Sequence, residues 1–319
     1  MSRDADYPVA NAVSRRDFLK RTMLVSSAVA GYGAAPLSEA KAAEPGRCPI
    51  VVFSKVYQEL GLNFNEAAEV SSEAGLDGVD SPVRPGGEIE PERVAEELPR
   101  YAGILRERKL QIPLLSTGIL STATPHAEDV LRAAGTAGVQ YYRIGFIERE
   151  AGVSSEKQAR EVRARLKDLT ALNKAIGIGA LIQNHSPAGN HTYFGGDLRE
   201  IAAALEGLDP AQAGVAFDIG HALVVHGAEW RRYFELVKPH FRIAYVKDVA
   251  AGRRWVPFGQ GDIAGTGYFK LLRQMGYHAP ISMHMEYDWT NHGKNKSRAG
   301  LVKALKESRA ALEGWLADA

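Results

Sequence analysis

The stretch Ala213-Gly-Val-Ala-Phe-Asp-Ile-Gly-His221 is an apolar run that ends abruptly in an acidic residue, a glycine and a histidine. A short apolar run bounded by glycine is typical of a buried strand whose carboxyl end carries polar groups. Residues 241–248, which end in Lys-Asp, and residues 279–286, which end in His-Met-Glu, follow the same plan. Three such strands, separated by helix-length segments, predict chemistry at the carboxyl edge of a parallel sheet.

Apolar runs upstream complete a regular alternation of strands and helices. Eight strands alternating with helices over ~270 residues are typical of an α/β fold closed into a (β/α)8 TIM barrel. A doubly wound sheet is the alternative, but no glycine-rich phosphate motif follows the first apolar run. We therefore expect one TIM-barrel domain over residues 43–319, with its site at the carboxyl ends of the strands. The five further strands are expected at residues 49–53, 78–83, 112–117, 141–145 and 178–185.

The N-terminal segment has the pattern of an export signal. Ser14-Arg-Arg-Asp-Phe-Leu-Lys20 resembles a twin-arginine motif, an apolar stretch follows, and Ala40-Lys-Ala42 offers the small residues that a signal peptidase reads. The apolar stretch is too short and too rich in glycine for a stable membrane span. We expect residues 1–42 to be a twin-arginine signal peptide and the mature protein to be periplasmic.

The composition limits the possible partners. The chain is 45% hydrophobic, so it can bury a large core, and its formal net charge is +1. That charge gives no electrostatic reason to expect a nucleic acid or a membrane surface as partner. The single cysteine, Cys48, allows neither an intrachain disulfide nor a cysteine-based zinc cluster. A small molecule is the expected partner, and the oligomeric state stays open.

The alternation of strand side chains predicts which residues meet at the mouth of the barrel. Gln183 and His185 share one face of their strand, and His284 and Glu286 share one face of theirs. A carboxylate such as Glu286 in this position is the best candidate for moving a proton. Lys247, on the neighbouring strand, could stabilise an oxyanion or a phosphate.

Asp218 and His221 carry the strongest case for function. They lie three residues apart, so the chain must turn between them for both to reach the mouth. An acidic residue among histidine, amide and carboxylate neighbours could hold a divalent metal of the Mn, Mg, Co or Zn kind. Such an ion would polarise a carbonyl or an enediolate oxygen. Substrate contacts are expected from His185 and His221, together with Arg143 at a strand end and the aromatic face of Trp255 in the loop 250–266.

Five motifs in order give the chain a resemblance to the sugar phosphate isomerase/epimerase family, the xylose isomerase-like barrels. The likeness covers about residues 50–316, and the Gln-Asn-His-Ser and Ser-x-His-x-Glu forms resemble an exported, twin-arginine-signal subgroup of that family. The resemblance implies a TIM barrel acting on a carbohydrate. The motifs are Gln183-Asn-His-Ser, Phe217-Asp-Ile-Gly-His221, Val246-Lys-Asp248, Pro257-Phe-Gly-Gln-Gly-Asp-Ile263 and Pro280-Ile-Ser-Met-His-Met-Glu286.

The resemblance also implies a ligand set, and this chain departs from it. In the family, a divalent ion is held by Glu, Asp, His and Glu at the ends of strands five to eight, and the glutamates shuttle the proton. Asp218 matches, whereas Gln183, Tyr245 and His284 stand at the other three positions. The resemblance therefore implies either a metal site rebuilt from Asp218, His284 and Gln183, with His185 or His221 as a further ligand, or a barrel without metal.

These residues support two classes of function. The first is an isomerase, epimerase or lyase that abstracts a proton next to a carbonyl, with Glu286 or His284 as base, Lys247 as oxyanion partner and Gln183 beside them. A metal-free lyase belongs to this class. The second is a non-catalytic barrel that binds a sugar, which the missing glutamates favour. A DNA-repair endonuclease of the same superfamily requires a basic groove, which the charge does not provide.

Overall fold

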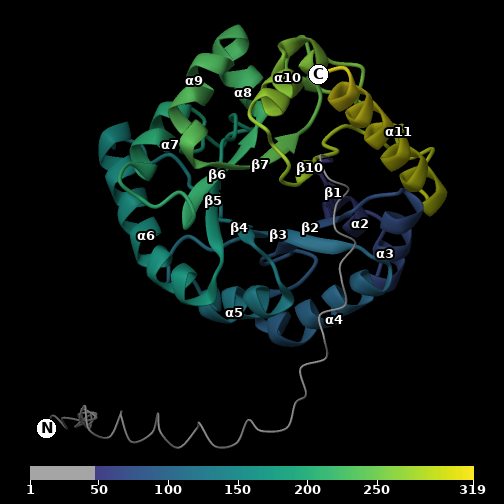
Figure 1. Cartoon of the computed structure of the whole chain (residues 1–319), viewed down its shortest axis with the longest axis horizontal. Helices are drawn as coiled ribbons and strands as arrows, with labels where there is room; N and C mark the ends of the chain where they lie inside the picture. The colour runs from purple at the N-terminus through teal and green to yellow at the C-terminus, as the bar shows by residue number, and fades with distance from the viewer. Residues whose placement is uncertain (1–46) are drawn as a thin grey trace, which may run out of the picture. The chain divides into compact units, whose positions relative to one another are not determined.

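The computed structural model describes residues 47–319, and in it eight parallel strands form one closed barrel surrounded by helices (Figure 1). The predicted TIM barrel is confirmed, and every predicted strand is present. The expected signal peptide lies outside the described residues. In order around the barrel the strands are β1 (Ile50–Phe53), β2 (Gly78–Val83), β3 (Gln111–Thr117), β4 (Tyr141–Arg143), β5 (Gly179–Gln183), β6 (Ala213–Asp218), β7 (Phe241–Val246) and β10 (Ile281–Met283), which closes onto β1.

Several helices begin at a side-chain cap. Asn63 forms a capping box with Glu66 at the start of α3, and Asp197 caps α7 as its position predicts. Within residues 47–319, no helix combines the length and the apolar character needed to cross a bilayer. The helices are α2 (Lys55–Gln58), α3 (Phe64–Glu73), α4 (Val94–Glu107), α5 (Ala127–Ala137), α6 (Ser155–Ile176), α7 (Leu198–Leu205), α8 (Ile219–His226), α9 (Trp230–Val237), α10 (Tyr268–Gln274) and α11 (Arg298–Ala317).

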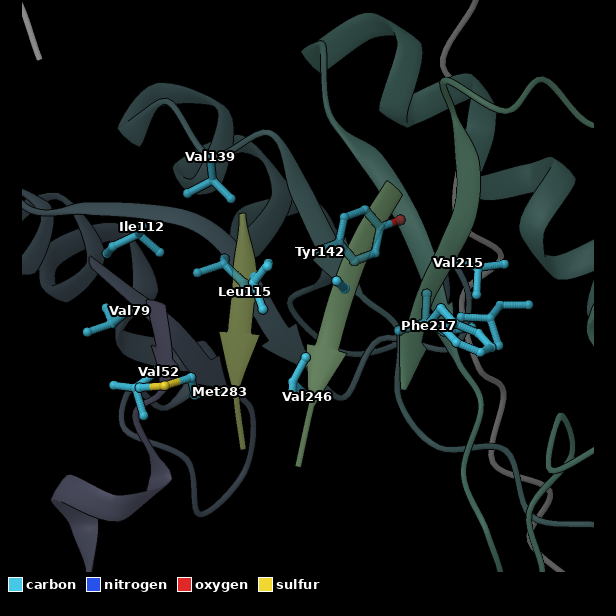
Figure 2. Close-up of a cluster of buried hydrophobic side chains, with 14 of the residues drawn as sticks. Val52, Val79, Ile112, Leu115, Val139, Tyr142, Val215, Phe217, Val246 and Met283 are labelled. Carbon is cyan, nitrogen blue, oxygen red and sulfur yellow. The ribbon is translucent and has the colours of Figure 1, made fainter. Parts of the chain in front are cut away.

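The core has two layers because strand side chains alternate. Outward-facing residues such as Val52, Leu115 and Phe217 pack in the layer that the helices cover (Figure 2). Inward-facing residues fill the barrel itself: Val51, Leu114, Leu181, Ala216, Ile243 and Tyr245. Gln183, Asp218 and Lys247 each follow one of these inward-facing residues, Leu181, Ala216 and Tyr245, by two positions. The same alternation therefore directs them inward at the mouth of the barrel.

The loop after β7 is more ordered than the sequence predicts. It contains a short hairpin of β8 (Val249–Ala250) and β9 (Arg254–Trp255). The buried carboxylate of Asp248 accepts four backbone N–H groups along the loop, from Val249, Gly259, Gly261 and Ile263, at 2.9–3.4 Å. One side chain thus fixes the segment that carries Trp255.

Candidate functional site

Asp218, at the end of β6, is fully buried and lies at the centre of the site. Its Oδ1 accepts the backbone N–H of His221 at 3.1 Å and so caps α8, which begins at the next residue. This helix provides the turn that Asp218 and His221 require to face the same mouth. Oδ2 accepts the side-chain amide of Gln183 at 3.1 Å and lies 3.2 Å from the Lys247 ammonium.

Asn184 fixes the backbone of Asp218 from the neighbouring strand. Its Oδ1 accepts the Asp218 N–H at 2.7 Å, and its Nδ2 donates to the Asp218 carbonyl at 2.9 Å. Alternation along β5 assigns Asn184 to the face opposite Gln183 and predicts no role for it. The structure shows that the amide replaces a strand partner at the point where β6 turns into α8.

Lys247 lies among three acceptors. Its Nζ is 2.9 Å from Nε2 of His221, 3.2 Å from Oδ2 of Asp218 and 3.7 Å from Oε1 of Glu286. A lysine ammonium has three N–H donors and no acceptor. His221 and Asp218 lie within hydrogen-bond distance and can take two of them, whereas Glu286 lies beyond that distance as an ion-pair partner. Lys247 is 2% exposed, which makes this a desolvated cation paired with two carboxylates.

The surroundings of His221 settle its tautomer. Lys247 can only donate, so Nε2 of His221 accepts, and the ring proton must be on Nδ1. Nδ1 then donates to the hydroxyl of Ser186, 2.8 Å away. Burial, and next the Lys247 charge, hold the pKa of His221 well below its ordinary value. The ring is therefore a neutral acceptor for the lysine.

His185 lies against His221, with ring centroids 3.8 Å apart. Its Nδ1 is 2.7 Å from the Ser186 carbonyl, which can only accept, so Nδ1 carries the proton. Its Nε2 therefore bears a lone pair. Burial and the Lys247 charge lower the pKa of His185 to about 4, so the ring is neutral at physiological pH. The rings of Phe146 and Tyr193 pack around it.

Trp255 covers the cluster from the loop after β7. Its ring meets His221 edge-on at 5.0 Å, and the Lys247 ammonium lies 5.2 Å from its centroid. The close packing depends on Gly220, because a Cβ there would lie 2.6 Å from Cγ of Lys247 and 3.1 Å from the indole. Trp255 thus lies beside His221 and Lys247, and its predicted contact with substrate stays a prediction.

Glu286 is the most accessible member of the cluster, with 32% of its side chain exposed. Burial acts to raise its pKa, but the charge of Lys247, followed by that of His284, outweighs burial and lowers the pKa. The side chain is therefore a carboxylate at neutral pH. It lines a cavity of about 140 Å³, together with residues from the ends of β1 and β10 such as Phe53, Lys55 and Tyr287.

His284 contacts Asp80 rather than the predicted co-ligand Asp218. Its Nε2 is 3.7 Å from Oδ2 of Asp80, and this nitrogen is buried without a hydrogen-bond partner among residues 47–319. Asp80 is fully buried at the mouth and accepts the hydroxyls of Ser116 and Ser282. Sequence reasoning assigned no role to Asp80. Asp80 is the third residue of β2 and follows only Gly78 and Val79, so the signal that identified Asp218, an acid at the end of an apolar run, is absent there.

Arg143 is present at the mouth but is buried. Its Nη1 donates to the Ile144 carbonyl at 2.8 Å, and the guanidinium lies 4.5 Å from the Phe146 ring centroid. These contacts fix the conformation of its side chain. Its predicted contact with substrate stays a prediction.

The residues present do not fit a divalent metal. In the described part of the chain, no group of three or more His, Cys, Asp and Glu side chains is arranged to hold one. Gln183 points an amide N–H at Asp218, and His284 pairs with Asp80, so the predicted set of Asp218, His284 and Gln183 does not assemble. The Lys247 ammonium occupies the space between the Asp218 carboxylate, Nε2 of His221 and the Glu286 carboxylate.

Several solved structures share this fold. The 3-keto-D-glucoside 4-epimerase of E. coli superposes with a TM-score of 0.64 at 14% identity, covering 86% of this chain and 100% of that one. D-allulose 3-epimerase from Methylomonas sp. gives 0.60 at 14% identity, covering 84% and 98%. A probable 3-DHS dehydratase from Bacillus anthracis gives 0.60 at 16% identity, covering 81% and 97%. No curated protein matches the chain.

At these identities the structural likeness establishes the fold and leaves the reaction open. The sequence itself matches a described family over residues 68–315, which include seven of the eight barrel strands and the whole cluster around Asp218. The chain belongs to the xylose isomerase-like TIM barrel family.

Proposed function

We propose that the protein is a carbohydrate-active enzyme that moves a proton on a carbon next to a carbonyl group, as isomerases and epimerases do. The observation that carries the proposal is the pairing of the Lys247 ammonium with the accessible Glu286 carboxylate, 3.7 Å apart, at the mouth of the barrel. Membership of the xylose isomerase-like family supports it, and so does the similarity in fold to two sugar epimerases.

The reaction uses the two groups in complementary roles. Glu286 removes the proton, the C–H bond breaks, and its electron pair forms a carbon–carbon double bond while the carbonyl pair moves onto oxygen. Lys247 donates a hydrogen bond to this oxygen as it becomes negative. Trp255 offers an aromatic face to the sugar ring beside the reacting carbon.

A second proton carrier is required to complete an epimerisation or a shift to the adjacent carbon. His185 has a free lone pair on Nε2 and stays neutral at physiological pH, so it can take up or deliver a proton. Gln183 cannot act as a base. Its amide holds Asp218, which in turn positions Lys247.

The protein is proposed to act outside the cytoplasm. The twin-arginine pattern at residues 14–20 supports export in the folded state, and the small residues at 40–42 support removal of the leader. The substrate would then be a sugar or glycoside of the periplasm.

Deuterium exchange tests the reaction even when the product is unidentified. The mature protein is incubated in D₂O with a panel of ketoses and 3-keto glycosides, and NMR detects deuterium on the carbon next to the carbonyl. We expect exchange with at least one compound, and a loss of about 10²–10⁴-fold in Glu286→Gln. Glu307→Gln, on an exposed part of α11, is the matched control and should keep full exchange.

A sugar-binding barrel is the second candidate, and Gln183 in place of a carboxylate favours it. The same panel distinguishes the two by calorimetry. Binding of a sugar without deuterium exchange would support the binding protein and contradict the enzyme.

A further inference from the structure

We infer that the ammonium of Lys247 takes the place of a divalent metal ion, so that the protein carries its catalytic cation as a side chain. The inference deepens the proposed function, since it names the source of positive charge at that site. It rests on the arrangement of acceptors around Nζ.

The acceptors around Lys247 are the kinds of atom that ligate Mn²⁺ or Zn²⁺. They are a carboxylate oxygen of Asp218, the Nε2 lone pair of neutral His221 and a carboxylate oxygen of Glu286, all within 3.7 Å of Nζ. Imidazole nitrogen and carboxylate oxygen are common ligands of such ions. Lys247 therefore uses the lone pairs that a metal would require.

A metal and Lys247 cannot share this position. The ammonium is buried and already lies between the two carboxylates, so a second cation would face both its charge and its volume. Removing the lysine would leave Asp218 and Glu286 as two negative charges around a vacated space. The same lysine thus both occupies the site and neutralises it.

Two of the three side chains, those of Asp218 and His221, are held in place without Lys247. Asp218 is fixed by its N-cap bond to His221 and by the amide of Gln183, and the His221 ring is fixed by the hydroxyl of Ser186. A small residue at 247 should therefore leave Asp218 and His221 as two fixed ligands, and Glu286, with 32% of its side chain exposed, as the third group that can close on an ion. The expected effect is a gain of metal binding by mutation.

The test measures Mn²⁺ binding by electron paramagnetic resonance, without substrate, on protein dialysed against chelator. We expect the wild type not to bind Mn²⁺. We expect Lys247→Ala to bind about one equivalent, at least tenfold more tightly than either the wild type or Lys247→Met. Lys247→Met fills the space without a charge and should not gain the site. Lys247→Ala/Glu286→Gln should lose at least tenfold in affinity relative to Lys247→Ala. Circular dichroism and the midpoint of thermal unfolding confirm that each variant is folded.

Two results would overturn the inference. One is near-stoichiometric Mn²⁺ binding by the wild type, or near-stoichiometric metal in wild-type protein isolated without chelator, a measurement that needs no variant. The other is a Lys247→Ala protein that binds Mn²⁺ no better than Lys247→Met. Because neither readout involves turnover, a failure here is distinguishable from a failure of the proposed proton transfer, which deuterium exchange reports.

Discussion

Asn184 holds both main-chain polar groups of Asp218, accepting its N–H at 2.7 Å and donating to its carbonyl at 2.9 Å. The contact joins the end of β5 to the residue at which β6 becomes α8. Both backbone groups are buried, so no solvent replaces the amide if it is removed. The position of the Asp218 carboxylate therefore depends on Asn184, which bonds the Asp218 backbone and makes no hydrogen bond to the carboxylate itself.

Asn184→Ala should lower the free energy of unfolding by about 2–4 kcal/mol, because it leaves two buried backbone groups unpaired. Urea unfolding of the mature protein measures the change. Asn65→Ala, at an exposed position near the start of α3, is the control and should stay within about 0.5 kcal/mol of wild type. Equal stabilities for the two variants would contradict the role given to Asn184.

Gly220→Ala should impair both stability and activity. The new Cβ would lie 2.6 Å from Cγ of Lys247, so the lysine stem and Trp255 must move. Overpacking of this kind costs about 1–3 kcal/mol. Gly314→Ala, in α11 where a Cβ meets open space, should instead be neutral or stabilise by up to about 1 kcal/mol. Thermal unfolding and the deuterium-exchange rate check both variants.

The contribution of His185 to the stability of the protein should fall as the pH is lowered. Its pKa is about 4 in the folded protein against an ordinary value of 6.5, so the unfolded chain binds the proton first. Stability is therefore lost between about pH 6.5 and 4. In His185→Asn the free energy of unfolding should fall less over this interval, as measured by urea unfolding at pH 7 and pH 5.

His221 contributes in the same direction, because its pKa is also lowered, and it is present in both proteins. His292→Asn, with 89% of its side chain exposed, serves as the control and should keep the wild-type pH dependence. A His185→Asn protein with the wild-type dependence would show that His185 is not held neutral by the fold.

Asp248→Ala should loosen the loop of residues 249–263 locally. Four backbone N–H groups lose their common acceptor, and hydrogen bonds to a charged group contribute about 1.5–3 kcal/mol each. Hydrogen exchange followed by mass spectrometry should show faster exchange in this loop, with the loop 186–196 unchanged. Faster exchange throughout the barrel would instead indicate a global loss of stability.

Arg15→Lys/Arg16→Lys should block export, because the paired arginines are the defining feature of a twin-arginine signal. Cell fractionation after expression of the full-length chain should recover the wild type from the periplasm and the double variant from the cytoplasm. Arg21→Lys preserves the pair and should leave export unchanged. Periplasmic recovery of the double variant would contradict a twin-arginine route.

The sequence was sufficient to predict the barrel and much of its mouth. Apolar runs ending in polar residues marked the strands and identified Asp218 and Lys247, and alternation grouped Gln183 with His185 on one face; the structure brings these residues together at the mouth. These predictions succeed because the period of two is a property of each strand alone. The helix caps at Asn63 and Asp197 are equally local and were also predictable.

The pairings between strands could not be predicted. Alternation gives the face of His284 but not which side chain on another strand it meets, because that depends on strand tilt and register around the barrel. The structure pairs it with Asp80 on β2. The sequence likewise predicts that Lys247 could stabilise an oxyanion but does not predict its three neighbours. These are His221, Asp218 and Glu286, which come from separate segments of the chain.

Asp218 uses one carboxylate oxygen to start a helix and the other to hold the lysine. A substitution at Asp218 is therefore expected to disturb the fold and the proposed reaction together. Glu286 bears no such double constraint, since it neither begins a helix nor lies in a strand. New substrates within this lineage should therefore arise through exchanges at the rim, while the buried centre stays unchanged.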